Sequence, residues 1–327
     1  MTSKRTNRAL HFSFLALLLC ALCASSPLLS ALNSSPSAPS GRPKMLGIVG
    51  VSLISSDFAK SQVFYGNVLG LTRTKAKLEA TDSTDPRCDF NSGRCFLTSR
   101  GQAVSLLSPC GVEGPCETNF LFAVTIETSD AAGLRELLKA SKIPVSEMRE
   151  NGKAFTAIDP DRHRIHFIET STLKRSGGAN EHPSEHPLIH AGFVVRDRVA
   201  MDHFYKDILG FHLYWHGGMK DNETNWVDMQ VPDGTDWLEY MLNVPPNASH
   251  KTLGVMNHIA LGVPDIHAAQ QQLLKNGWKG TERPQIGRDG KWQLNLYDPD
   301  ETRVELMEFT PVEKPCCSEY TGPHPKP

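Results

Sequence analysis

The feature that most constrains this chain is an internal repeat. Matching positions recur at one spacing of about 140 residues: Asp57 and Asp197, Phe64-Tyr65 and Phe204-Tyr205, Leu69-Gly70 and Leu209-Gly210. Several matches at a single offset indicate a duplicated structural unit, because independent coincidences rarely share one spacing. Any fold assigned to this chain must therefore contain the same unit at least twice.

Each unit begins with a short apolar stretch that ends at an aspartate. These aspartates are Asp57, Asp130, Asp197 and Asp265. Aspartate is a favoured helix N-cap, so each stretch reads as a strand followed by a helix. Further apolar segments come after each helix, and the turns Asp159-Pro160-Asp161 and Asp298-Pro299-Asp300 each precede a closing strand. The sequence predicts four units, each with one strand, one helix and three strands.

The N-terminal residues have the order of a secretory signal. Lys4, Arg5 and Arg8 precede an apolar run over residues 12–24, and small residues follow. A charged, then apolar, then small-residue order is typical of a signal peptide, and this apolar run is too short to span a bilayer comfortably. We expect residues 1–31 to be a signal peptide cleaved between about 24 and 31, and the protein to be secreted or periplasmic.

The remaining chain divides by composition and periodicity. Residues 32–44 are a Ser/Pro-rich lead-in, 45–171 the first domain, 172–187 a linker without periodicity, 188–312 the second domain and 313–327 a Pro-rich tail. Lys and Arg number 34 against 36 Asp and Glu, which gives nucleic-acid binding no electrostatic support. We expect a small-molecule substrate as partner, no nucleic acid, and no membrane contact beyond the export signal.

Export also changes the interpretation of the cysteines. Six remain after the signal peptide: Cys88, Cys95, Cys110, Cys116, Cys316 and Cys317. An even number in an oxidising compartment favours disulfides. Cys88 and Cys95 bracket one turn, and Cys110 and Cys116 bracket another, so local bridges are expected there. For the adjacent pair Cys316-Cys317 a tail disulfide or an inert pair is favoured over a metal site.

These motifs resemble the vicinal oxygen chelate superfamily, which includes glyoxalase I, type I extradiol dioxygenases and bleomycin-resistance proteins. The resemblance rests on the unit order, on the Phe-Tyr-x-x-x-Leu-Gly helix end and on the Asp-Pro-Asp turn before Val304-Glu305-Leu306. It implies an α+β fold of four βαβββ modules, paired into two domains that are each a curved, partly open β-barrel with flanking helices. It also implies a divalent metal ion held inside a barrel.

The second half offers residues at the places where the resemblance implies metal ligands. They are His190, Glu239, His258 and Glu305. Alternate strand residues share a face, so Trp237 and Glu239 point the same way, while Glu305 and Glu308 point to opposite sides. A Glu inside an apolar barrel is costly unless something positive meets it. Two imidazoles and two carboxylates suit one divalent ion of Fe, Mn, Ni, Co or Zn.

The first half departs from that pattern. Gly50 and Ala123 stand at the positions of the two strand histidines, and His166 stands at that of Glu305. One histidine does not hold a catalytic metal ion. We therefore expect residues 45–171 to be a degenerate domain without metal ligands, with His166 a packed or surface side chain.

Two reaction types remain open. A set of four ligands would resemble glyoxalase I. In this chain Glu239 or Glu305 would then act as the base of an isomerase or lyase. Two histidines and Glu305 alone resemble an extradiol dioxygenase, which keeps coordination positions open. Tyr297 is a candidate acid or base beside the metal, or else a core aromatic residue.

Two further alternatives involve no catalysis: a ligand-sequestering protein like the bleomycin-resistance proteins, and a structural module closed by its metal. Because paired units complete a barrel within one chain, the protein is expected to be a monomer or a homodimer. The leading interpretation is an exported metal-dependent enzyme of the glyoxalase-like lyase or isomerase type, with the ring-cleaving dioxygenase as its alternative.

Overall fold

The computed structural model describes residues 41–73, 94–98, 102–109, 120–169 and 186–327. Ala38–Pro327 form one compact unit. The expected signal peptide lies outside the described residues, and so do Cys88, Cys110 and Cys116. Among the helices that are described, none combines the length and the apolar character needed to cross a bilayer.

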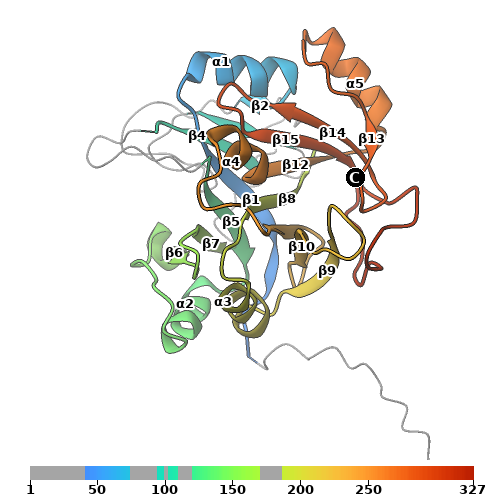
Figure 1. Ribbon diagram of the computed structural model, residues 1–327. Coiled ribbons are helices and arrows are strands. Elements are labelled where there is room, and N and C mark those ends of the chain that lie inside the picture. The colour runs from blue at the N-terminus through green and yellow to red at the C-terminus, as the bar shows by residue number, and fades with distance from the viewer. Residues whose placement is uncertain (1–40, 74–93, 99–101, 110–119, 170–185) are drawn as a thin grey trace, which may run out of the picture. The chain divides into compact units, whose positions relative to one another are not determined.

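The first half of the chain forms a mixed sheet of seven strands (Figure 1), in the order β2-β3-β4-β1-β5-β7-β6. In chain order these are β1 (Met45–Ile54), β2 (Thr72–Arg73), β3 (Cys95–Leu97), β4 (Ala103–Leu107), β5 (Leu121–Thr128), β6 (Ala154–Ile158) and β7 (Arg164–Glu169). The second unit has one strand fewer than expected among its described residues. In place of a first strand after its helix it has two isolated bridges, Val145 with Ala157 and Arg149 with Ala154.

The second half forms an eight-stranded sheet with the order β13-β14-β15-β12-β8-β11-β10-β9. Its strands are β8 (Leu188–Val194), β9 (His212–Gly217), β10 (Trp226–Gln230), β11 (Trp237–Met241), β12 (His258–Val263), β13 (Gln285–Ile286), β14 (Trp292–Tyr297) and β15 (Arg303–Glu308). Residues from β9 and β13, which are at opposite edges, line one cavity. The sheet is therefore curled into a half-barrel.

Strand pairing confirms the predicted four-unit α+β fold. The two first strands of each sheet, β1 with β5 and β8 with β12, are antiparallel neighbours at its centre. Each of these strands pairs in parallel with the closing strand of its own unit, as β8 does with β11 and β12 with β15. Parallel pairing requires a crossover, and in all four units the helix supplies it.

Four of the five α-helices begin where the sequence predicts, directly after the capping aspartates. The five helices are α1 (Phe58–Gln62), α2 (Ala131–Ala140), α3 (Arg198–Asp202), α4 (His250–Met256) and α5 (Ile266–Lys275), of which α4 was not predicted. The aspartates expected as N-caps accept backbone N–H groups, as Asp57 does from Ala59 and Lys60. Two helices continue as π-helical turns, η1 (Val63–Val68) after α1 and η5 (His203–Ile208) after α3. The repeat therefore extends to this unusual helical geometry.

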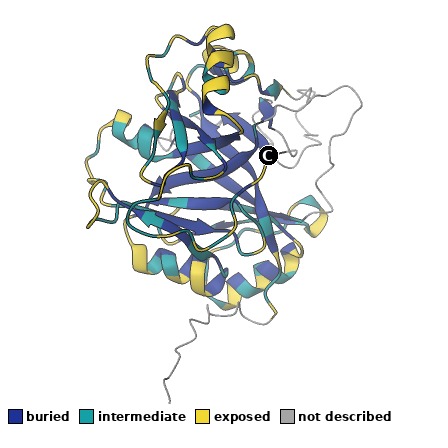
Figure 2. Cartoon of the chain, turned by 90° about the vertical axis from the view of Figure 1, so that its right-hand side faces the viewer, coloured by how far each residue is buried: buried dark blue, intermediate teal, exposed yellow. Residues whose placement is uncertain are grey.

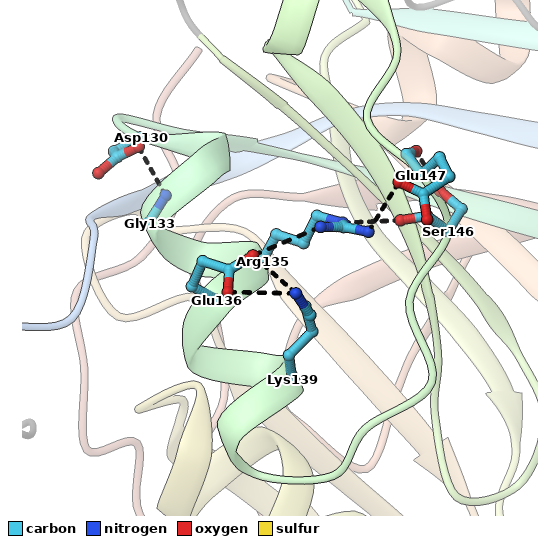
Figure 3. A network of polar contacts seen from close by, with 7 residues as sticks. All are labelled: Asp130, Gly133, Arg135, Glu136, Lys139, Ser146 and Glu147. Carbon is cyan, nitrogen blue, oxygen red and sulfur yellow. Dashed lines mark hydrogen bonds and ion pairs between the residues drawn. The ribbon is translucent and has the colours of Figure 1, made fainter.

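Helix α2 shows how a helix is attached to the loop that follows it (Figure 3). Asp130 Oδ1 accepts from Gly133 N at 2.8 Å, and Arg135 Nε donates to Ser146 O at 2.8 Å. The ion pair of Arg135 with Glu147 is 3.2 Å long, but the Glu147 side chain is 96% exposed. Exposed pairs contribute little, so the cap and the bond to the Ser146 carbonyl carry the attachment.

Burial is concentrated on the strands, while exposed residues follow the outer faces of the helices (Figure 2). The largest core cluster contains side chains from both halves, among them Tyr65, Phe167, Tyr205 and Leu306. One hydrophobic core thus extends through residues of all four units.

Two tyrosines connect the halves in the same way. Tyr65, from η1, donates to Asp298 at 2.9 Å, and Tyr205, from η5, donates to Asp159 at 3.1 Å. Each tyrosine belongs to the first unit of its own half, and each aspartate belongs to the closing turn of the other half. The first unit therefore contacts the fourth, and the third contacts the second, so the two halves interlock with quasi-twofold symmetry.

We expect Tyr65→Phe to lower the free energy of unfolding by roughly 1–3 kcal/mol, because the buried Asp298 carboxylate loses a donor. Burial raises the pKa of Asp298 to about 6, and the Tyr65 hydroxyl partly opposes that rise. Only the ionised carboxylate needs the donor, so the loss should be larger at pH 8 than at pH 5 in urea unfolding. Tyr297→Phe, at an exposed position, is the control. Equal losses of unfolding free energy in Tyr65→Phe and Tyr297→Phe would contradict a stabilising hydrogen bond from Tyr65 to Asp298.

Candidate metal centre

Two histidines face each other at the centre of the curled sheet. His190 lies on β8 and His258 begins β12, and in the antiparallel register His190 pairs with Ala260. Their Nε2 atoms are 3.1 Å apart, and both side chains are buried. Two imidazole nitrogens this close have room for only one proton between them, so at least one of them presents a lone pair to this point.

Glu305 completes a three-residue group. It lies on β15, where it pairs with Ala260 of the neighbouring strand β12, and its Oε2 is 3.7 Å from His190 Nε2. One ligand atom from each of His190, His258 and Glu305 lies within 4.8 Å of the other two. All three residues are buried.

Glu239 approaches the histidines from β11. Its Oε2 is 2.9 Å from His258 Nε2 and 3.5 Å from His190 Nε2. Its side chain is 13% exposed, against 4% for Glu305. The structure thus brings together the four residues predicted as ligands, with Glu239 standing outside the tight group of three.

The electrostatics of the cluster suit a cation. Burial lowers the pKa values of His190 and His258 well below their ordinary value. Burial also raises the pKa of Glu305 to about 8, with nearby Glu239 adding to the rise. Neutral imidazoles keep the lone pairs that a metal ion requires. A divalent ion would supply the positive charge that favours the ionised form of the Glu305 carboxyl group. The donor set therefore fits a divalent metal ion.

Arg303 is part of this arrangement. Its Nη2 donates to His258 Nε2 at 2.7 Å, and its Nε is buried without a partner among the described residues. The guanidinium therefore uses a lone pair that a metal ion would also use. Metal binding at His258 requires Arg303 to release this nitrogen.

A cavity of ≈330 Å³ adjoins the cluster. Its walls include His190, Glu239 and Glu305 together with the three tryptophans Trp215, Trp226 and Trp237. Asp228 and Asn295 also line it, and each has a buried side-chain oxygen without a partner in the described part of the chain. A small molecule with a flat apolar body and hydrogen-bond donors fits such walls.

Lys291 lies buried beside this cavity. Its Nζ is 3.4 Å from the Tyr214 hydroxyl and lies 4.6 Å from the ring centroid of Trp237 and 5.1 Å from that of Tyr320. Burial lowers the pKa of Lys291, while Asp289 and Asp228 oppose that shift. Aromatic faces and nearby carboxylates are what keep a buried ammonium tolerable.

The C-terminal tail is irregular and packs on the edge strand β9 and its neighbour β10. Trp215 Nε1 donates to Cys316 O at 3.2 Å, and Gln230 Nε2 donates to Pro323 O at 2.9 Å. Tyr320 donates to Asp289 O at 2.8 Å. Cys316 and Cys317 form a disulfide, as the sequence favoured. Cys95 is also disulfide-bonded.

The remaining predicted residues have other surroundings. Tyr297, at the end of β14, is 37% exposed and is not among the residues that line the cavity. Glu308 lies on the opposite face of β15 from Glu305, and its Oε1 accepts from Ile266 N at the start of α5. In the first half, His166 bonds Thr156 Oγ1 through Nδ1 at 2.7 Å, and burial lowers its pKa to about 4. The described residues of that half contain no metal-ligand group.

Sequence reasoning missed three contributors to the site: Arg303, Lys291 and Gly192. Gly192 lies opposite His258, and a Cβ there would come within 2.0 Å of the His258 ring. Its absence of a side chain makes room for the imidazole. Signals were available for two of them. Alternation along the strand places Arg303 on the same face as Glu305. Gly192 is a glycine inside an apolar strand, and such glycines often mark a close approach.

Residues 188–306 match the model of the family described as Glyoxalase/Bleomycin resistance protein/Dioxygenase superfamily. Among curated protein sequences, no relative matches the chain. The fold is similar to that of a solved catechol 2,3-dioxygenase, at 13% identity and a TM-score of 0.59, covering 87% of this chain and 96% of that one.

It is also similar to an extradiol ring-cleaving dioxygenase from B. fuscum, at 18% identity and a TM-score of 0.54, covering 82% of this chain and 73% of the other. At such identities the likeness concerns the fold alone. The matched region, its two modules and the pairing of their strands lead to one conclusion: residues 188–306 belong to the Glyoxalase/Bleomycin resistance protein/Dioxygenase superfamily.

Proposed function

We propose that this protein is a divalent-metal-dependent enzyme that binds a small substrate through two adjacent oxygen atoms. The observation that carries the proposal is the buried group of His190, His258 and Glu305 beside a cavity of ≈330 Å³. A metal ion bound there would act as a Lewis acid on the substrate oxygens. The tryptophan walls would orient the substrate and exclude water, and Glu239 would hold or accept a proton beside His258.

Of the two reaction types, ring cleavage by a dioxygenase is the better supported. Two imidazoles and one carboxylate leave coordination positions open for both a substrate and dioxygen. The group whose ligand atoms all lie within 4.8 Å of one another comprises His190, His258 and Glu305, which supports this ligand count. The names of the similar structures, catechol 2,3-dioxygenase among them, point the same way.

A glyoxalase-like lyase or isomerase is the second candidate. It is favoured by the 2.9 Å contact of Glu239 with His258, which places a second carboxylate within reach of the same centre. In that reaction Glu239 would be a fourth ligand and would carry the proton between two substrate carbons. A ligand-sequestering role without metal leaves the grouping of two histidines and a buried Glu unexplained.

The variant Glu239→Gln separates the two reactions. A dioxygenase with three ligands should keep its metal stoichiometry in this variant, whereas a four-ligand lyase should lose metal. Protein loaded anaerobically with Fe(II) should consume oxygen when catechol is added. Protein loaded with Ni(II) or Zn(II) should instead convert the hemithioacetal of methylglyoxal if the lyase is correct. Failure of both assays with fully loaded protein would contradict an enzymatic role of these two types.

We also propose that the protein is exported to a secreted or periplasmic location, which rests on the pattern of residues 1–31 alone. The division into domains 45–171 and 188–312 has the support of the two sheets, whose described strands fall on either side of residues 170–185. The first domain then serves as a structural partner of the second.

A further inference from the structure

A second cavity, of ≈510 Å³, is lined by a different set of residues from the cavity at the metal centre. It is formed where the Asp159-Pro160-Asp161 turn of the first half meets the end of β8 and the helix α4. The polar residues of its lining are Asp161, Arg162, His163, Arg164, Arg196 and Asn257. Its apolar residues include Phe120, Leu121 and Leu253. The cavity therefore combines a basic wall with an apolar one.

The charges of this cavity are not balanced. Two arginines, Arg162 and Arg196, line it with one carboxylate, Asp161, while a third, Arg164, lies over the ring of Phe122. Asp161 Oδ2 already accepts the backbone N–H groups of Arg196 and Asp197, at 2.7 and 3.3 Å. The Arg196 guanidinium donates to the Val244 carbonyl, and within the described residues neither Arg196 nor Arg162 forms an ion pair. Positive charge is thus left available to a ligand.

The basic wall is held in place by the fold. Two contacts hold the His163 side chain in one orientation. Its Nδ1 is 2.8 Å from Asp159 Oδ2, and its ring packs on Phe193 with 4.3 Å between the ring centroids. Arg162 lies in this turn with a φ of 74°, which sets its backbone geometry. The side chains of Arg162 and Arg196 are themselves exposed, so their guanidinium groups are accessible to a ligand that enters the cavity.

The quasi-twofold symmetry of the chain supplies an internal control. At the other junction Asp300 accepts from Ser56 N, as Asp161 accepts from Arg196 N. There the position of Arg162 is taken by Glu301, which has nearly the same φ of 66°, and that of His163 by Thr302. This junction thus forms with Glu301 and Ser56 at the positions of Arg162 and Arg196. The fold therefore does not require the positive charge at Arg162 and Arg196.

We propose that this cavity binds an organic oxyanion, a carboxylate or a phosphate monoester, whose charged group contacts Arg162 and Arg196. Its apolar body lies against Phe120, Leu121 and Leu253. Guanidinium groups match the geometry of both oxyanions, and a cavity of this volume is large enough for a small ligand. This cavity is distinct from the one at the metal centre, since the two share no lining residue.

Calorimetric titration of the full-length protein tests this proposal. The probes are phenyl phosphate, phenylacetate and uncharged benzyl alcohol, and the metal-site variant Glu305→Gln is titrated in parallel to remove binding at the metal. Both anions should bind to both proteins, and benzyl alcohol should not. Tighter binding of one anion tells whether phosphate or carboxylate is preferred. Absence of binding by both anions would overturn the proposal.

Matched variants locate the site. Arg162→Gln and Arg196→Gln should each weaken binding roughly tenfold or more, since each removes a charge-assisted hydrogen bond. Arg198→Gln is the control, because Arg198 pairs with Asp202 and does not line the cavity. Arg162→Glu copies the other junction, so it should fold normally and abolish binding. Unchanged affinity in a folded Arg162→Glu protein would refute the assignment.

Discussion

Replacing Lys291 by methionine is expected to lower the free energy of unfolding by about 3–5 kcal/mol at neutral pH. Lys291 is fully buried, and its backbone N–H donates to Asp289 Oδ1. The ammonium is the positive group that faces the buried carboxyls Asp228 and Asp289. Removing one member of a buried set of charges leaves the others uncompensated, and this costs more than the lost interaction itself.

The stability that Lys291→Met loses should depend on pH. Burial raises the pKa of Asp228 well above its ordinary value and also raises that of Asp289, while Lys291 opposes both shifts. Without Lys291 both values rise further, so the folded variant binds more protons than its unfolded chain. Its stability should therefore fall as pH increases above the ordinary carboxyl pKa. Chemical unfolding at pH 5 and pH 8 should show the larger deficit at pH 8.

Lys314→Met provides the control for this experiment, because the Lys314 side chain is 82% exposed and its ion pair with Glu319 lies on the surface. That change should alter stability by less than about 0.5 kcal/mol. If Lys291→Met were as stable as the control at both pH values, the buried charge cluster would have no energetic role.

Glu305→Gln is expected to weaken metal binding by more than about 100-fold. Losing a residue that only hydrogen-bonds to a metal ligand weakens binding by at most about 100-fold, so loss of a ligand itself should exceed that value. The amide keeps the size of the side chain but loses the negative charge that a divalent ion needs. Because the pKa of Glu305 is raised to about 8, metal affinity in the unmodified protein should also rise as pH increases from 6 to 8. Equilibrium titration with a chromophoric chelator measures both effects.

The matched change Glu308→Gln lies on the same strand but on its other face. Glu308 accepts the Ile266 N–H at 2.9 Å, so this variant should keep full metal affinity. Weakening of the cap of α5 should cost it about 1 kcal/mol of stability. Equal metal affinities in Glu305→Gln and Glu308→Gln would contradict the assignment of Glu305 as a ligand.

The fold was predictable because its main signals are local and repeated. Asp57, Asp130, Asp197 and Asp265 each act as the predicted N-cap, and α5 begins directly after Asp265 as predicted. The candidate ligands followed from the same repeat, since His190 and His258 occupy equivalent strand positions. Alternation along β15 also separated Glu305 from Glu308 correctly, because neighbouring strand residues face opposite sides.

The remaining features depend on contacts between residues far apart in the chain. The bond between Tyr65 and Asp298 links two different units, and no periodicity reports it. Lys291 was hidden for a similar reason: a lysine is ordinarily exposed, and only the tail residue Tyr320 completes its aromatic surroundings. Tyr297 was a candidate acid or base beside the metal, yet it does not line the cavity. An aromatic residue near a turn carries no information on whether its side chain reaches a cavity.

The central claim is that His190, His258 and Glu305 form a metal centre, and metal content tests it most directly. Elemental analysis of the purified mature protein should find about one equivalent of a divalent transition metal. The same analysis of a folded His190→Ala/His258→Ala variant should find none. Retention of stoichiometric metal in that variant, or its absence from the unmodified protein even after reconstitution with Fe(II), Ni(II) and Zn(II), would contradict the account.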